Sequence, residues 1–169
     1  MELAPAARRE LLSRPAVTGY VQGRVFKYKL DQHVDQKGTR AVVVAPDGGW
    51  AQPNPVNTPA FQLLRVECWA DCSREDDGHG RLEKAAGDAI DNAWALYRAV
   101  DRELHPPGGI RGVRWGAVGS DPGLLVVTCQ RWTEPNWHDA DNPDGSGRNF
   151  GEAAMVTTTY ALQLSYGRD

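Results

Sequence analysis

Cysteine is scarce in this chain of 169 residues, which has only three: Cys68, Cys72 and Cys129. Three thiols cannot form a fully paired disulfide framework, and such a chain is more simply explained by a reducing compartment. We therefore expect free thiols in a protein that folds without disulfide bonds.

Long apolar runs are also missing, and charges are present from the first residues. Segment 1–13 carries Glu2, Arg8, Arg9 and Glu10, so it has the pattern of neither a secretory signal nor a membrane span. The sequence predicts a protein made in a cytoplasm, with no membrane partner.

The chain also lacks an excess of positive charge. The chain has 19 Lys and Arg against 22 Asp and Glu, well mixed along its length, for a formal net charge of −3. A broad positive field is what draws a protein to nucleic acid or to anionic lipid. The composition therefore disfavours generic binding to either.

The composition that remains is typical of one globular domain. Hydrophobic residues make up 41% of the chain, and there are 18 glycines. A chain of this length buries about two-thirds of its unfolded surface, which is enough for a core without disulfides or a structural metal. We predict a single domain over 1–169 that needs no cofactor.

Periodicity predicts the first elements. Apolar residues recur at helical spacing over 3–11, and Pro15 closes that short helix. β-Branched and aromatic residues over 18–30 and 40–44 then predict two strands. The polar segment 31–39 between them predicts a hairpin with an exposed tip.

A loop rich in glycine and proline over 47–59 leads into a strand over 61–71. Alternate residues of a strand point to opposite faces of its sheet. This strand therefore has an apolar face and a charged, amphipathic face: Leu64, Val66, Cys68 and Ala70 against Arg65, Glu67, Trp69 and Asp71.

The second half begins with the clearest pattern in the chain, an amphipathic helix over 82–104. Strand-like segments over 110–118 and 124–132 flank a turn and predict an antiparallel hairpin. A last strand covers 154–166, and the polar segment 133–152 before it predicts a long functional loop. The order of elements predicts an α+β fold, in which one long and one short helix pack on a mainly antiparallel sheet.

One acidic segment has residues that suggest a metal site. His138, Asp139, Asp141 and Asp144 are close in sequence, and a metal-dependent hydrolase centred on them is an alternative function. The spacing does not fit a calcium loop, because the carboxylates do not alternate as that loop requires and no glutamate follows at its twelfth position. We expect no metal ligands here.

Catalytic motifs are lacking elsewhere. The chain contains no nucleophile elbow, no phosphate-binding glycine loop and no His-Glu-x-x-His helix. Cys129 lies in an alternating apolar segment, which is the usual position of an inert core thiol. We expect no catalytic residue and no enzymatic activity.

Two pairs of neighbouring residues suggest a platform on which bases could stack: Arg114 with Trp115, and Arg131 with Trp132. A single-strand nucleic-acid binder is therefore a further alternative. The net charge favours a different interpretation, in which the tryptophans cover a sheet face and the arginines pair with carboxylates of the 61–71 strand.

Large amphipathic side chains are the remaining unexplained feature. Tyr, Trp and Arg are enriched in protein interfaces, and this chain places arginines among five of its tryptophans. The composition thus favours an assembly protein. The tryptophans are Trp50, Trp69, Trp115, Trp132 and Trp137.

The order of these segments resembles that of the tail terminator, or tail completion, proteins of long-tailed, non-contractile bacteriophages. The resemblance covers most of the chain and consists of an order of elements and loose patterns, without an invariant motif. It begins with a short helix and ends with closing strands. The segments that carry it are Gly23-Arg24-Val25-Phe26, Val42-Val43-Val44 with Pro46-Asp47-Gly48-Gly49, the strand 61–70, the helix 82–104, and Thr158, Tyr160, Leu162 and Leu164.

The resemblance implies a structural virion protein that acts without chemistry at the junction of tail and neck, after assembly in the bacterial host cytoplasm. Such proteins form a hexameric ring on the head-proximal end of the tail tube, stop its growth and join the tail to the head–neck connector. The partners implied are other copies of this chain, the tail tube protein and a connector protein. DNA can pass through such a ring without sequence-specific binding.

Two sets of contact residues follow as expectations. Candidate subunit or partner contacts are Arg65, Glu67, Trp69, Arg114, Trp115, Arg131, Trp132 and Trp137, and candidate tube or neck contacts at the hairpin tip are His33, Asp35, Lys37 and Gly38. The nearest alternative function is another neck component, either a head completion protein or a connector ring subunit. Its location in the virion would distinguish it from a terminator.

Overall fold

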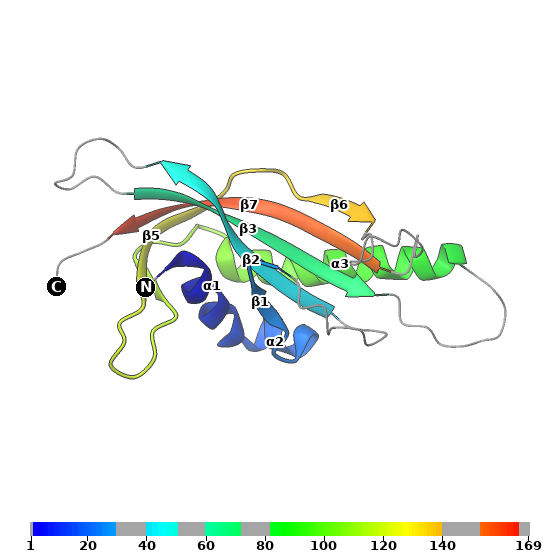
Figure 1. The fold of residues 1–169 in the computed structure, drawn as a ribbon, viewed down its shortest axis with the longest axis horizontal. Coiled ribbons are helices and arrows are strands. Elements are labelled where there is room, and N and C mark those ends of the chain that lie inside the picture. Colours follow the sequence, from blue (N-terminus) through cyan, green and yellow to red (C-terminus); the bar gives the residue numbers. More distant parts are fainter. Residues whose placement is uncertain (1, 30–39, 51–59, 72–81, 140–152, 166–169) are drawn as a thin grey trace.

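The computed structural model describes residues 2–29, 40–50, 60–71, 82–139 and 153–165. Three helices and seven strands occur in these residues, in an α+β arrangement with a mostly antiparallel sheet, as expected (Figure 1). The helices are α1 (Leu3–Leu12), α2 (Pro15–Val21) and α3 (Leu82–Leu104). The strands are β1 (Val25–Lys27), β2 (Arg40–Trp50), β3 (Ala60–Asp71), β4 (Val113–Trp115), β5 (Leu124–Arg131), β6 (Asn136–Asp139) and β7 (Ala153–Ser165).

The strands form one sheet in the order β1-β2-β3-β7-β5-β4, with β6 paired to β7 as well. All pairs are antiparallel except β1 with β2. The long strands β3 and β7 lie next to each other at its centre, paired from Ala60↔Leu164 to Asp71↔Ala153. The helices lie on one side of the sheet, which leaves the opposite side without a described helix (Figure 1).

The core lies between the helices and the sheet face that carries Leu64, Val66 and Cys68. These alternate residues of β3 are fully buried, whereas the intervening ones are only partly buried. Each buried Leu or Val side chain contributes about 1.5–3 kcal/mol through removal of apolar surface from water. The two-faced strand predicted from the sequence is therefore confirmed.

Helix α3 has the bounds that its periodicity predicts. Ala89, Ala93 and Leu96 are fully buried, at the spacing of three and four residues that places side chains on one face of a helix. The small alanines let the helix approach the sheet closely. None of the helices in the described ranges is long and apolar enough to cross a membrane.

The expected first hairpin is wrong. Residues 15–21, in part predicted as strand, form α2, because Pro15 occupies the first turn and Val17 and Val21 bury one helical face. Gln22 then adopts a left-handed conformation at a φ of 48°, which ends the helix. Strand is confined to β1, which pairs with β2 in parallel, and a parallel pair cannot be joined by a tight hairpin.

The hairpin tip expected to contact tube or neck, with His33, Asp35, Lys37 and Gly38, lies outside the described residues. The loop expected from Asp47 is also partly wrong, since β2 continues to Trp50 through a bulge between Pro46 and Gly49. The glycines explain the bulge. Gly48 has a φ of +92°, and a Cβ on Gly49 would lie 2.7 Å from the carbonyl oxygen of Phe61.

The second hairpin, β4 with β5, and the last strand β7 are confirmed, although β4 is shorter than expected. A register shift between Val126 and Thr128 changes the alternation of β5. Cys129 is therefore buried together with Val126, whereas simple alternation places it with Leu125 and Val127. The long loop expected over 133–152 is interrupted at its start by β6, which pairs with β7.

Candidate protein-interaction face

The sheet has a face opposite the helices, which we call the outer face and define by Arg65, Glu67 and Trp69 of β3. Residues that are directly paired across strands lie on the same face, so the register extends it over β2, β7 and β6. Three rows result: Ala41–Trp69–Met155–His138, Val43–Glu67–Thr157–Asn136 and Ala45–Arg65–Thr159. The members from β2 are buried, at 0–5% exposed, so the accessible part of the outer face lies on β3, β7 and β6.

A hydrogen-bonded network orders the polar side chains of this face. Arg65 Nε donates to Glu67 Oε1 over 3.0 Å, and Trp69 Nε1 donates to Glu67 Oε2 over 3.0 Å. Arg65 Nη1 lies 3.3 Å from Asp47 Oδ1, and Thr159 Oγ1 donates to Asp47 Oδ2 over 3.4 Å. The Arg65–Asp47 pair is exposed, and pairs of this kind contribute only about 0–1 kcal/mol to stability. The main effect of the network is to hold each side chain in one orientation.

Asp47 is a member of this network that the sequence analysis missed. The sequence pattern predicts a loop at Asp47, whereas the bulge in β2 brings its carboxylate beside Arg65. The available signal was an acidic residue directly before two glycines, at the end of an apolar strand. Glycines at that position are typical of a bulge as well as of a loop.

The row that contains Trp69 is the most apolar part of the outer face. Trp69 and its partner Met155 are half-buried, and His138, which pairs with Met155, is exposed. Aromatic residues, Met and Arg are the residues enriched at protein interfaces. A half-buried Trp–Met pair beside an ordered polar network is therefore a surface suited to contact another protein.

Two more candidate residues lie where β5 passes into β6. Trp132 is 57% exposed and Trp137 is 45% exposed. Thr133 between them is held firmly, because its carbonyl oxygen accepts from Thr158 Oγ1 over 2.8 Å and its own Oγ1 accepts from the Thr159 amide over 2.9 Å. Trp137 pairs with the buried Val156, so it stands on the helix side of the sheet, at the edge of β6.

The expected stacking platform of Trp115, Arg131 and Trp132 is not formed. Trp115 is only 1% exposed and belongs to the core, so its side chain offers no surface contact. Arg131 Nη2 binds Asp101 Oδ2 of α3 over 2.6 Å, and not a carboxylate of β3 as the competing interpretation supposed. Arg114 is exposed on β4, where its Nη1 donates to the Pro122 carbonyl.

Asp101 forms a polar cluster beneath the sheet that the sequence pattern does not indicate. Besides Arg131, its carboxylate accepts from Tyr160 Oη over 2.8 Å and from Tyr97 Oη over 3.3 Å. Burial raises the pKa of Tyr97 to about 12, and burial also raises the pKa of Tyr160. The cluster joins α3, β5 and β7.

The acidic segment offers no metal centre within the described residues. His138 is exposed on β6, while Asp141 and Asp144 lie outside the described ranges. In the ranges that are described, no group of three or more His, Cys, Asp or Glu side chains is placed to hold an ion. Burial raises the pKa of both the Cys68 thiol and the Cys129 thiol, which keeps them protonated and unreactive.

Comparison with known proteins gives a match in fold. No protein-family model matches the chain, and no curated protein matches it either. Its structure is similar to a chain of the solved structure described as "Virion of native gene transfer agent (GTA) particle", with a TM-score of 0.58 and 10% sequence identity. The similarity covers 96% of this chain and 93% of that one. The two chains share a fold over almost their whole length.

Proposed function

We propose that this protein is a structural component of a phage-like virion. The observation that carries the proposal is the fold shared with a chain of a gene transfer agent virion over 96% of this chain. The candidate face supports it, because its ordered Arg, Glu and Trp side chains suit protein contact. The role is structural and needs no cofactor.

Within the virion, we propose the position of a tail terminator. The protein would form a hexameric ring on the head-proximal end of the tail tube, stop its growth and connect it to the neck. The order of elements that resembles this family supports the assignment, since α3 has its predicted bounds and β3 begins one residue before its predicted start. DNA would pass through the ring without sequence-specific contacts.

Each copy would use the outer face to contact its neighbour. Arg65, Glu67 and Trp69 would form the centre of the contact, and the exposed Trp132 would extend it beyond the end of β5. The exposed Trp137, on the helix side of β6, would contribute at the edge of the sheet. Arg114 on β4 would contribute at a separate edge. A closed ring requires two different contact surfaces on each subunit, and a sheet face and a strand edge meet that requirement.

The position in the virion is tested by interrupting the gene and examining the particles by electron microscopy. A terminator predicts tails of uncontrolled length that are not joined to heads. Tails of normal length that remain separate from filled heads would instead indicate a connector. Normal tails joined to heads would contradict a structural role in the tail or neck.

The contact face is tested by Trp69→Ala, with Tyr28→Ala as the control. Tyr28 is an aromatic residue, 50% exposed, that lies just beyond β1. We expect W69A to keep the far-ultraviolet circular dichroism of the native fold and to lose assembly, as measured by native mass. Assembly that is unchanged in W69A would remove Trp69 from the interface.

A further inference from the structure

Helix α1 contacts both ends of the sheet. β1 and β4 stand at opposite ends of the strand order β1-β2-β3-β7-β5-β4, yet α1 packs against each of them. The sheet is curled and α1 lies within the curl (Figure 1). A single helix can therefore hold the two ends at a fixed separation.

At the first end, α1 closes the free edge of β1. Residues before and after Val25 bond to β2: the Arg24 carbonyl accepts from the Val42 amide, and the Tyr28 amide donates to the Val44 carbonyl. The Val25 carbonyl consequently points away from β2, toward the position of a further strand. Arg8 Nε of α1 donates to this oxygen over 2.7 Å. The side chain thus occupies a site where a foreign strand would pair.

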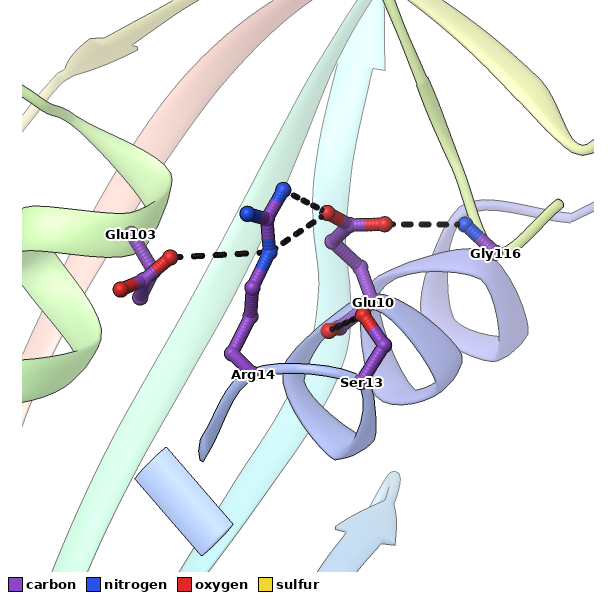
Figure 2. Close-up of polar contacts among 5 residues, drawn as sticks. All are labelled: Glu10, Ser13, Arg14, Glu103 and Gly116. Atoms are coloured by element: carbon purple, nitrogen blue, oxygen red, sulfur yellow. Dashed lines mark hydrogen bonds and ion pairs between the residues drawn. The ribbon is translucent and has the colours of Figure 1, made fainter. Parts of the chain in front are cut away.

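At the other end, α1 binds the residue that follows β4. The Gly116 amide donates to Glu10 Oε2 over 3.2 Å, as Figure 2 shows. Glu10 is only 8% exposed, and Arg14 Nε donates to its other oxygen over 2.9 Å. Arg14 also lies 3.5 Å from Glu103 of α3, so the carboxylate is held between the helices and the sheet end.

Gly116 also packs closely against α1, in addition to its hydrogen bond with Glu10. A Cβ on this glycine would lie 3.1 Å from the Ala6 carbonyl oxygen and 3.2 Å from Arg9 Cβ, both on α1. Its φ of +69° lies in the left-handed region that glycine adopts readily. A larger residue at Gly116 would push α1 away from β4 without changing any charge.

From these contacts we propose that α1 is a clasp that opens as one unit and, while closed, fastens both ends of the curled sheet. Opening releases the Val25 carbonyl and the Gly116 amide together, because one short helix binds both. The sheet centre, β3 and β7, stays paired in the open state. The clasp rests on the contacts of α1 alone and does not depend on the proposed virion role.

Native-state hydrogen exchange of the full chain tests the clasp. In low denaturant, we expect the amides of α1, the edge of β1 and Gly116 to share one opening equilibrium. The amides of β3 and β7 should open only with global unfolding. Exchange of β1 and Gly116 at unrelated rates would overturn the proposal, as would a single global opening for all of these amides.

Two variants separate the clasp from general destabilisation. Glu10→Ala removes the buried acceptor, and Gly116→Ala forces the two backbones apart. Each should raise the opening equilibrium about 5-fold to 100-fold at α1, β1 and Gly116 together, with little change in β3. Arg9→Ala is the control, because the Arg9–Asp121 pair is exposed, and its effect should stay below about 5-fold.

If either variant fails to fold, the exchange pattern of the unaltered chain still tests the clasp. A variant that speeds exchange of α1 alone, with β1 as protected as before, would show that the helix does not fasten both ends. This result would leave the virion role unaffected, because gene interruption tests that role separately.

Discussion

Asp101 shows how a single side chain holds three elements together. Its carboxylate accepts from Arg131 of β5, Tyr160 of β7 and Tyr97 of its own helix. Its pairing could not be foreseen, because Asp101 lies among the polar residues of a helix with an exposed face. Only the packing of α3 on the sheet places this carboxylate beside a tyrosine 59 residues away.

We predict that Asp101→Asn lowers the free energy of unfolding by about 2 kcal/mol, since the new amide places a donor where Arg131 and the tyrosines need an acceptor. Urea unfolding measures the change. Asp91→Asn on the exposed side of the same helix is the matched control, with an effect of less than about 0.5 kcal/mol. Equal effects of the two variants would show that the cluster contributes nothing specific.

Buried thiols and tyrosines make the fold sensitive to alkali. Burial raises the pKa of the Cys129 thiol from 9.0 to about 12 and that of Tyr97 from 10.0 to about 12. The folded chain therefore keeps protons that the unfolded chain releases at lower pH, so a rise in pH favours unfolding. This contribution is complete below about pH 9 and is lost as pH rises toward 12.

We therefore expect the free energy of unfolding to fall above pH 9, by up to about 1.4 kcal/mol per pH unit for each buried thiol. Urea titrations at pH 8, 9, 10 and 11 measure this slope. Cys129→Ala should make the slope between pH 9 and 10 shallower. A stability that stays constant from pH 8 to 11 would contradict the burial of these groups.

Trp115 illustrates what composition cannot decide at the residue scale. Tryptophan is common both at interfaces and in cores, and the neighbouring Arg114 suggested an exposed position. The structure buries Trp115 and exposes Trp132, although each directly follows an arginine. The difference lies in their surroundings: β4, which carries Trp115, packs against α1, whereas Trp132 follows the end of β5.

At the scale of elements, long periodic segments were predictable and short ones were not. Helix α3 and strands β3 and β7 each have enough alternating residues to specify both type and face. The segment 15–21 has only two buried residues, Val17 and Val21, and its β-branched residues also suit a strand. The segment is helical because these two valines pack into the core from one face of a helix.

The β4–β5 turn offers a sharp test at the same scale. A Cβ on Gly123, which has a φ of +68°, would lie 2.3 Å from the Trp115 carbonyl oxygen, whereas Gly119, at a φ of +58°, has open space around it. We predict that Gly119→Ala costs about 1 kcal/mol through backbone strain alone. Gly123→Ala should cost more than about 3 kcal/mol in the same urea assay. Similar costs would mean that the turn has room to move.

At the scale of the whole molecule, the sequence supported the architecture but not the connection of its first strands. The antiparallel centre follows from alternation in β3 and β7, whereas β1, with only three residues, is too short for local patterns to reveal its parallel pairing with β2. The candidate face was likewise foreseen only in part. Arg65, Glu67 and Trp69 were identified, but Asp47, Met155 and His138 join them through pairing between distant strands.

The proposed position on the end of a tail tube is tested most directly with labelled protein on purified tubes. Gold-labelled chain should appear by electron microscopy at one end of each tube, as a single ring, and should prevent further subunits from adding there. W69A should bind more weakly, because weaker contacts between neighbouring copies would leave the ring incomplete. Label spread along the tube, or tubes that keep growing with the chain in excess, would contradict this position.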